Sequence, residues 1–194
     1  MAIPALKIIF LMGLVSSSII RMPHQRVQQK NIIADDRKTT QEKTLLVAVF
    51  LGMFILPMLY ILTPWLRFAD YSLPFWANIL GVLIFAIALW LFWCSHHDLG
   101  KNWSPTLQMR EDHTLITDGI YRTIRHPMYT AIWLWAMAQG LLLTNWIVGL
   151  SGILTFGTLY FLRVGNEEKM MLEQFGNQYQ AYMQQTKRLL PRLF

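Results

Sequence analysis

The sequence predicts an all-α integral membrane protein, a helical bundle of about five membrane-embedded helices. Only 14% of the 194 residues are charged and 54% are hydrophobic, whereas soluble domains carry about 25% charged residues. The apolar residues gather in five runs, and no stretch of the chain is rich in strand patterns. We therefore expect a single membrane domain over residues 1–194.

The first three runs supply three predicted transmembrane helices. Leu45–Leu66 and Pro74–Cys94 are long enough, because a spanning helix needs about 20 apolar residues. Ile3–Ile20 is a weaker candidate, since Pro4 and Lys7 lie near its start. A cleaved signal peptide is the alternative for this run, although the six basic residues in the loop that follows oppose export.

The last two runs, Met128–Thr144 and Ile147–Leu162, are short and are separated only by Asn145 and Trp146. They predict a tight helical hairpin that need not cross the whole bilayer. Within the second run, Pro57 is expected to kink its helix.

The polar tail Glu167–Arg188 carries apolar residues at helical spacing. It predicts a helix that lies along the membrane surface or caps the bundle.

The basic residues predict the orientation in the membrane. Six Lys or Arg fall in Arg21–Thr44, four in His96–Pro127 and five from Arg163 onward, so 15 of the 17 lie on one side. Cytoplasmic loops are enriched in Lys and Arg, which predicts an outside N-terminus and a cytoplasmic C-terminus. This placement accounts for the net charge of +6, and no nucleic-acid partner is expected.

The densest polar chemistry occurs in two segments, "GIYRTIRHPMYT" (Gly119–Thr130) and "LYFLRVGNEEK" (Leu159–Lys169). The predicted hairpin would make them neighbours. Arg163 and Glu167 are four residues apart and share a helix face. Taken singly, these residues also fit structural roles: an interfacial salt bridge, or a helix that begins at Pro127.

Taken together, an ordered series of motifs resembles a known family. The series is "LGKNW" (99–103), "HTLITDGIYRTIRHPMY" (113–129), "RVGNEE" (163–168), "FGNQYQAY" (175–182) and "KRLLP" (187–191). It resembles the isoprenylcysteine carboxyl methyltransferases and their phospholipid-methyltransferase relatives, in particular the prokaryotic and archaeal integral membrane members. The resemblance covers residues 99–191, about half of the chain.

The resemblance implies an integral membrane enzyme that uses S-adenosyl-L-methionine, releases S-adenosyl-L-homocysteine and binds both on the cytoplasmic side. It divides the domain into transmembrane helices (1–95), a cofactor-binding segment (96–127), the hairpin (128–163) and a cytoplasmic C-terminal helix (164–194). The membrane would be the cell membrane of a prokaryote or the endoplasmic reticulum of a eukaryote.

The resemblance also implies the site residues. The implied cofactor contacts are Gln108, His113, Thr114, Leu115, Ile116, Gly119, Tyr121, His126, Pro127, Met128, Tyr129 and Glu167. Arg163 would hold the substrate, and Arg163 with Glu167 would form the catalytic pair. Backbone N–H groups near "DGIY" would be placed to hold the cofactor's carboxylate.

The implied methyl acceptor is lipophilic, first of all the C-terminal carboxylate of a prenylated cysteine. The guanidinium of Arg163 matches a carboxylate or a phosphate. A phospholipid amine is the alternative, which needs a proton acceptor such as Glu167 or Glu168. A membrane sterol or lipid reductase is a second alternative, in which basic residues bind the phosphate of NADPH: Arg110, Arg122 and Arg125.

Other classes of protein fit less well. The chain has no G-x-G-x-x-G motif after a strand, which argues against a soluble Rossmann-type methyltransferase. A transporter or assembly factor would place charged residues within its spans, but the second, third and fourth runs contain no Asp, Glu, Lys or Arg. No metal is expected, because His96-His97-Asp98 and the single Cys94 fit no zinc pattern. The sequence does not define the oligomeric state.

Overall fold

The computed structural model describes residues 4–29, 33–37, 39–110 and 113–191. Its helices and strands are α1 (Pro4–Gln28), β1 (Ile33–Asp36), α2 (Thr40–Phe50), α3 (Leu56–Leu62), α4 (Phe75–Leu99), β2 (Gln108–Arg110), α5 (Pro127–Leu143), α6 (Trp146–Phe175) and α7 (Asn177–Gln185). The predicted all-α membrane architecture is confirmed, with one short strand pair added.

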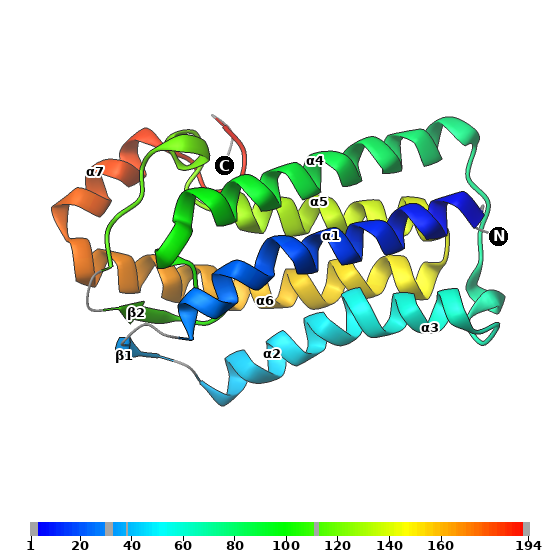
Figure 1. The fold of residues 1–194 in the computed structure, drawn as a ribbon, viewed down its shortest axis with the longest axis horizontal. Coiled ribbons are helices and arrows are strands. Elements are labelled where there is room, and N and C mark those ends of the chain that lie inside the picture. The colour runs from blue at the N-terminus through cyan, green and yellow to red at the C-terminus, as the bar shows by residue number, and fades with distance from the viewer. Residues whose placement is uncertain (1–3, 30–32, 38, 111–112, 192–194) are drawn as a thin grey trace.

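The long helices run side by side as a bundle (Figure 1). Helix α5 packs between α4 and α6, while α1 covers α4 and α5, and α2 packs on α6. The two strands and α7 lie together at one end of the bundle, and the α3–α4 connection lies at the other end. The polar motifs of the sequence therefore fall at the end that carries α7.

Within the described part of the chain, four helical stretches are long and apolar enough to cross a membrane: 4–28, 40–62, 75–102 and 146–175. Their outward faces expose large apolar side chains such as Leu83 and Leu154, as expected for surfaces that contact lipid. Helix α5 has only 17 residues, and much of it is buried among the others. The protein is thus an integral membrane protein, and α5 is its short embedded helix.

Helix α1 is part of the bundle core. The ring of Phe10 stacks on Phe85 with centroids 5.5 Å apart, and Trp135 meets both rings edge-on. A Cβ at Gly13 would lie 2.2 Å from the Phe85 ring, so the glycine permits this close approach. The weakest of the predicted spans is therefore fixed by aromatic packing against α4 and α5.

Just before Pro57, where the sequence predicts a kink, the structure has a π-helical turn, Leu51–Ile55, that joins α2 to α3. Leu56 donates its N–H to the carbonyl of Leu51, five residues earlier. The next bond of this pattern would run from residue 57 to Gly52, but proline has no N–H. The Gly52 carbonyl instead accepts from Gln139 Nε2 at 3.0 Å and Ser151 Oγ at 2.7 Å.

The predicted tight hairpin is confirmed. Helix α5 ends at Leu143, Thr144 adopts a left-handed conformation (φ 45°), and Asn145 caps α6 by accepting the N–H of Val148 at 3.2 Å. Trp146, expected in the turn, is the first residue of α6. The two helices leave the turn packed closely together.

Helix α6 is longer than the sequence analysis predicted. The predicted helix Glu167–Arg188 is in fact the end of α6 followed by the separate helix α7. Gly176 separates them with φ 51°, a backbone conformation that favours glycine. Arg163 and Glu167 therefore project from one continuous helix that leads out of the bundle.

The short antiparallel sheet was not predicted. It pairs Ile33 with Arg110, Asp35 with Met109 and Asp36 with Gln108. It links the connection between α1 and α2 to the segment that follows α4, next to the polar end of α6 (Figure 1).

Candidate active site

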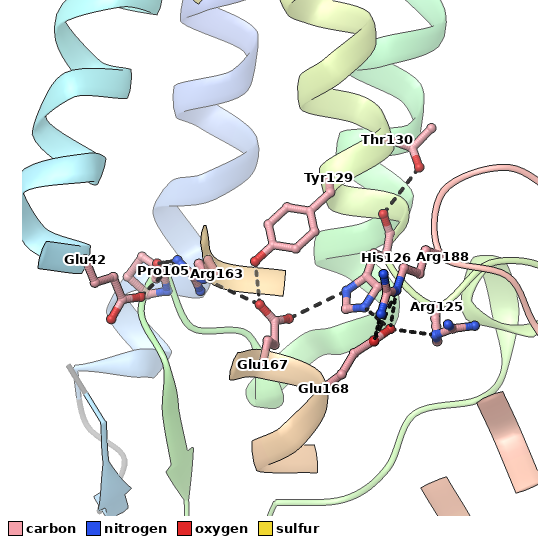
Figure 2. A network of polar contacts seen from close by, with 10 residues as sticks. All are labelled: Glu42, Pro105, Arg125, His126, Tyr129, Thr130, Arg163, Glu167, Glu168 and Arg188. Atoms are coloured by element: carbon pink, nitrogen blue, oxygen red, sulfur yellow. Dashed lines mark hydrogen bonds and ion pairs between the residues drawn. The ribbon is translucent and has the colours of Figure 1, made fainter. Parts of the chain in front are cut away.

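Arg163 is the centre of a polar network at the α7 end of the bundle (Figure 2). Its side chain is 10% exposed. Nη1 donates to the carbonyl of Pro105 at 2.8 Å and lies 3.1 Å from Glu42 Oε1. Nε lies 3.4 Å from Glu167 Oε2. The guanidinium is thus held between two carboxylates, one from α2 and one from its own helix.

Glu167 is fixed by the first turn of α5. Its Oε2 accepts the hydroxyl of Tyr129 at 2.5 Å, and its Oε1 lies 3.8 Å from His126 Nδ1. The rings of His126 and Tyr129 stack with centroids 5.3 Å apart. Because 27% of the Glu167 side chain is exposed, this carboxylate has room to accept further hydrogen bonds.

Glu168 has a different environment, although it is the next residue. Its carboxylate accepts from Arg125 Nε at 2.8 Å and from Arg188 Nη2 at 2.5 Å, and it lies 3.2 Å from His126 Nε2. Its side chain is 5% exposed. The hydrogen bond to Glu168 raises the pKa of Arg188. Glu168 is therefore engaged in a buried clamp, and Glu167 is the carboxylate that faces open space.

The C-terminal segment is tied to the start of α5, which explains the "KRLLP" motif. Arg125 and His126 donate their backbone N–H groups to the carbonyls of Lys187 and Arg188 at 2.9 and 3.0 Å. Thr130 Oγ1 donates to the carbonyl of Leu189 at 2.8 Å. These bonds bring Arg188 to Glu168 and close one side of the site.

The end of α4 shapes the loop before α5. Asp98 Oδ2 accepts the N–H of Ile120 at 2.8 Å, and Gly119 has φ 60°. A Cβ at Gly119 would lie 2.1 Å from Asp98 Oδ2, so only glycine fits. The N–H groups of Ile120 and Tyr121 are taken by Asp98 and Asp118. The idea that backbone groups of "DGIY" hold a carboxylate therefore fails for these two.

Most of the residues implied by the resemblance surround one cavity. Its walls include Gln108, His113, Leu115, Ile116, Tyr121, His126, Met128, Tyr129, Arg163 and Glu167. Three implied residues support it without lining it. Thr114 bonds to Asn102 at 3.0 Å, Gly119 makes the turn, and Pro127 begins α5.

The cavity also has walls that the resemblance did not imply. These are Leu99, Asn102, Trp103, Ser104, Thr106, Leu107, Arg125, Met170, Met171, Tyr179 and Tyr182. Burial raises the pKa of the Tyr121, Tyr179 and Tyr182 phenols, so these side chains are neutral at physiological pH. The position of Tyr179 and Tyr182 in "FGNQYQAY" was the available signal, because that motif belongs to the matched series.

A second cavity lies between α2 and the end of α6. It is lined by Arg37, Thr39, Gln41, Glu42, Leu45, Leu107, Leu162, Arg163, Asn166 and Lys169. Leu107 and Arg163 line both cavities. The guanidinium of Arg163 therefore stands at the boundary between an aromatic cavity and a cavity that combines basic and apolar walls.

Neither His96 nor His97, at the end of α4, lines either of these cavities. His96 Nδ1 bonds to the carbonyl of Phe92 at 2.8 Å, and His97 Nδ1 lies 3.0 Å from Asp98 Oδ1. Among residues 4–29, 33–37, 39–110 and 113–191, no three His, Cys, Asp or Glu side chains gather as metal ligands would.

The fold and the site define a class of integral membrane helical protein. Its cavity lies at one end of the bundle and is lined by His126, just before the start of α5, and by the pair Arg163 and Glu167 on α6. The chain belongs to the isoprenylcysteine carboxyl methyltransferase (ICMT) family, whose model matches residues 65–173. The resemblance predicted from the motifs is thereby confirmed.

Individual relatives agree with this assignment. The protein-S-isoprenylcysteine O-methyltransferase of Schizosaccharomyces pombe is 33% identical over 81 residues, which cover 42% of this chain and 34% of the relative. The human protein of the same name is 29% identical over 118 residues, covering 60% of this chain and 42% of the relative. The matches thus span less than half of the length of these curated relatives.

A solved structure shares the fold. The structure of the eukaryotic intramembrane Ras methyltransferase ICMT matches with a TM-score of 0.59 and 23% identity, covering 94% of this chain and 63% of that chain. The similarity extends over the N-terminal helices, for which the sequence motifs gave no match.

Proposed function

We propose that this protein is an S-adenosylmethionine-dependent methyltransferase that esterifies the carboxylate of a C-terminal prenylcysteine. The observation that carries the proposal is the position of Arg163, at the boundary of two cavities and 3.4 Å from Glu167. Membership of the ICMT family and the names of the relatives support this activity.

The aromatic cavity has the chemistry that S-adenosylmethionine requires. Leu115, Ile116 and Met128 offer apolar walls for the adenine ring. Glu167 can accept hydrogen bonds from an ammonium or a ribose hydroxyl, since part of its carboxylate is exposed. Tyr129 offers an aromatic face, which attracts a cation such as a sulfonium. We assign the cofactor to this cavity.

The proposed reaction needs alignment more than acid or base chemistry. When bound, S-adenosylmethionine would supply an electrophilic methyl group for the acceptor's carboxylate oxygen, with S-adenosylhomocysteine as the leaving group. A carboxylate acceptor has no proton to lose. Arg163 orients that carboxylate, and Glu167 and Tyr129 hold the other reactant.

The second cavity provides a path for a lipophilic acceptor. It has apolar walls at Leu45 and Leu162 and basic ones at Arg37 and Lys169. This combination suits an amphiphile with an anionic head group. We infer that the acceptor arrives from the bilayer between α2 and α6, while the cofactor arrives from water. The gathering of basic residues at this end favours a cytoplasmic site.

A phospholipid amine is a less suitable acceptor. Its methylation releases a proton, and Glu168 is already engaged by Arg125, Arg188 and His126. Glu167 already accepts a hydrogen bond from Tyr129. A carboxylate acceptor needs no such base, which favours the prenylcysteine over the amine.

The NADPH reductase alternative has little support at the cavity. Arg122 is exposed and does not line it, and Arg125 is paired with Glu168. The side chain of Arg110 lies outside the described part of the structure. Among the described residues, the arginines that line the cavity, Arg125 and Arg163, are paired with carboxylates and form no phosphate-binding cluster.

A methyl-transfer assay tests the proposal. Detergent-purified protein receives S-adenosylmethionine labelled in its methyl group and N-acetyl-S-farnesylcysteine, with phosphatidylethanolamine in a parallel reaction. We expect label in the prenylcysteine that mild base releases as methanol. Base-stable label in the phospholipid would favour the amine acceptor, and no transfer to either lipid would overturn the prenylcysteine proposal.

A further inference from the structure

Glu42 lies against the guanidinium of Arg163, the group that would bind an anionic acceptor. It lines the cavity between α2 and α6. Its Oε1 lies 3.1 Å from Arg163 Nη1 and accepts the N–H of Leu107 at 3.0 Å. Its side chain is 6% exposed. An acceptor carboxylate that reaches Arg163 from this cavity therefore meets a carboxylate already there.

The charges make simultaneous occupancy unfavourable. Arg163 has two carboxylate neighbours, Glu42 and Glu167, so the trio carries an excess negative charge when both are ionised. A further carboxylate at the same guanidinium would add like-charge repulsion in a poorly solvated site. The carboxylate of Glu42 therefore opposes the binding of an anionic acceptor for as long as it lies against Arg163.

The bonding of Glu42 suits such an exchange. Its Oε2 is buried without a hydrogen-bond partner among the described residues. Glu168, in contrast, receives hydrogen bonds on both oxygens, from Arg125 and Arg188. Since buried carboxylates that serve only the fold are normally well satisfied, Glu42 is held less completely than a structural group requires.

Helix α2 offers the displaced carboxylate another partner. Thr39 is its N-cap, and Thr39 Oγ1 accepts the N–H of Glu42 at 3.0 Å. This is half of a capping box, in which a glutamate at that position normally reaches back to the backbone N–H of the cap residue. A negative charge is also favourable at a helix N-terminus. A rotation of the Glu42 side chain can therefore exchange Arg163 for the end of its own helix.

We propose that Glu42 is a specificity-determining residue that occupies Arg163 until an anionic acceptor displaces it to the N-terminus of α2. The inference rests on the proposed function, because it takes Arg163 as the acceptor's binding group. It predicts that Glu42 weakens the binding of carboxylate acceptors, because its own carboxylate lies against the guanidinium that would bind them.

Glu42→Gln tests this role, since glutamine keeps the size and the acceptor for Leu107 but removes the charge. We expect the KM for N-acetyl-S-farnesylcysteine to fall about tenfold, with kcat changed less than about twofold. Inhibition by the uncharged amide of the same compound should not change. The matched control is Glu173→Gln, which removes a carboxylate from an exposed pair with Arg37 and should leave KM as in the wild type.

A KM that is unchanged or higher in Glu42→Gln would overturn the inference, since a residue that only positions Arg163 gives that result. Laurate binding, measured by calorimetry, supplies a readout that needs no turnover. Tighter laurate binding in Glu42→Gln than in the wild type and Glu173→Gln would support the role of Glu42 even if no prenylcysteine were methylated. In that case the proposed substrate would be wrong.

Discussion

Replacing Glu168 with glutamine should destabilise the protein by about 3 kcal/mol, because it breaks a buried charge cluster from one side. The carboxylate accepts from Arg125 Nε at 2.8 Å and from Arg188 Nη2 at 2.5 Å. The side chain of Arg125 is only 9% exposed, so it would lose its counter-charge without gaining water. Glutamine retains one oxygen acceptor, which places the cost at the lower end of the usual range of about 3–5 kcal/mol.

The assay is thermal unfolding in detergent together with calorimetric binding of S-adenosylhomocysteine. For a chain of this size, about 3 kcal/mol corresponds to a fall in Tm of roughly 6–12 °C. Binding should weaken too, because Arg188 holds the C-terminal segment against α5 and the adjacent α7 supplies Tyr179 and Tyr182 to the cavity wall.

The same substitution at Glu173 is the matched control. Glu173 also lies on α6, but its side chain is 45% exposed and pairs with Arg37 and Lys169 at the surface. Exposed pairs contribute about 0–1 kcal/mol, so Glu173→Gln should change Tm by less than about 4 °C. If Glu168→Gln unfolded within 2 °C or so of this control, the buried clamp would not contribute as argued.

Three further substitutions separate the roles of the site residues. Gly119→Ala should lower the free energy of unfolding by about 2 kcal/mol, because φ is 60° and the new Cβ would lie 2.1 Å from Asp98 Oδ2. An unchanged Tm in thermal unfolding would contradict that geometry. Arg163→Ala should lower kcat/KM at least about 100-fold and leave the affinity for S-adenosylhomocysteine within about threefold of the wild type; retained turnover would remove its assigned role. Glu167→Gln should weaken S-adenosylhomocysteine binding about tenfold, as calorimetry can measure, and unaltered affinity would assign cofactor binding to other residues.

The features that the sequence predicted are those with a local signal. The hairpin follows from two apolar runs separated by Asn145, which caps α6 as its residue type favours. Pro57 predicted a kink in its helix, but not the π-helical turn that precedes it in the structure. The π-helical turn depends on donors from Gln139 and Ser151, and no local pattern identifies partners so distant in the chain.

The missed features depend on contacts between distant segments. The strand pair joins residues 33–36 to 108–110, and each strand is too short to show a pattern of its own. In the sequence, Glu42 stands three residues after Thr39, as the glutamate of an ordinary capping box does. Its contact with Arg163 arises only because α2 packs on α6.

The residues of the candidate site were predicted from the motif series, and the structure adds how their environments differ. His126, Tyr129 and Glu167 come together at one cavity as the resemblance implied. Arg125 and Glu168 looked equally suited to chemistry in sequence, yet they are buried against each other. Burial and pairing distinguish these residues, and adjacency in sequence does not.

The measurement that tests the central claim most directly is calorimetric titration of the detergent-purified, folded protein with S-adenosylhomocysteine, with NADPH in a parallel titration. We predict saturable one-site binding of S-adenosylhomocysteine and no binding of NADPH. Binding of NADPH alone would contradict the account and make the cavity a reductase site. Binding of neither compound would contradict the assignment of a cofactor to the cavity beside Glu167.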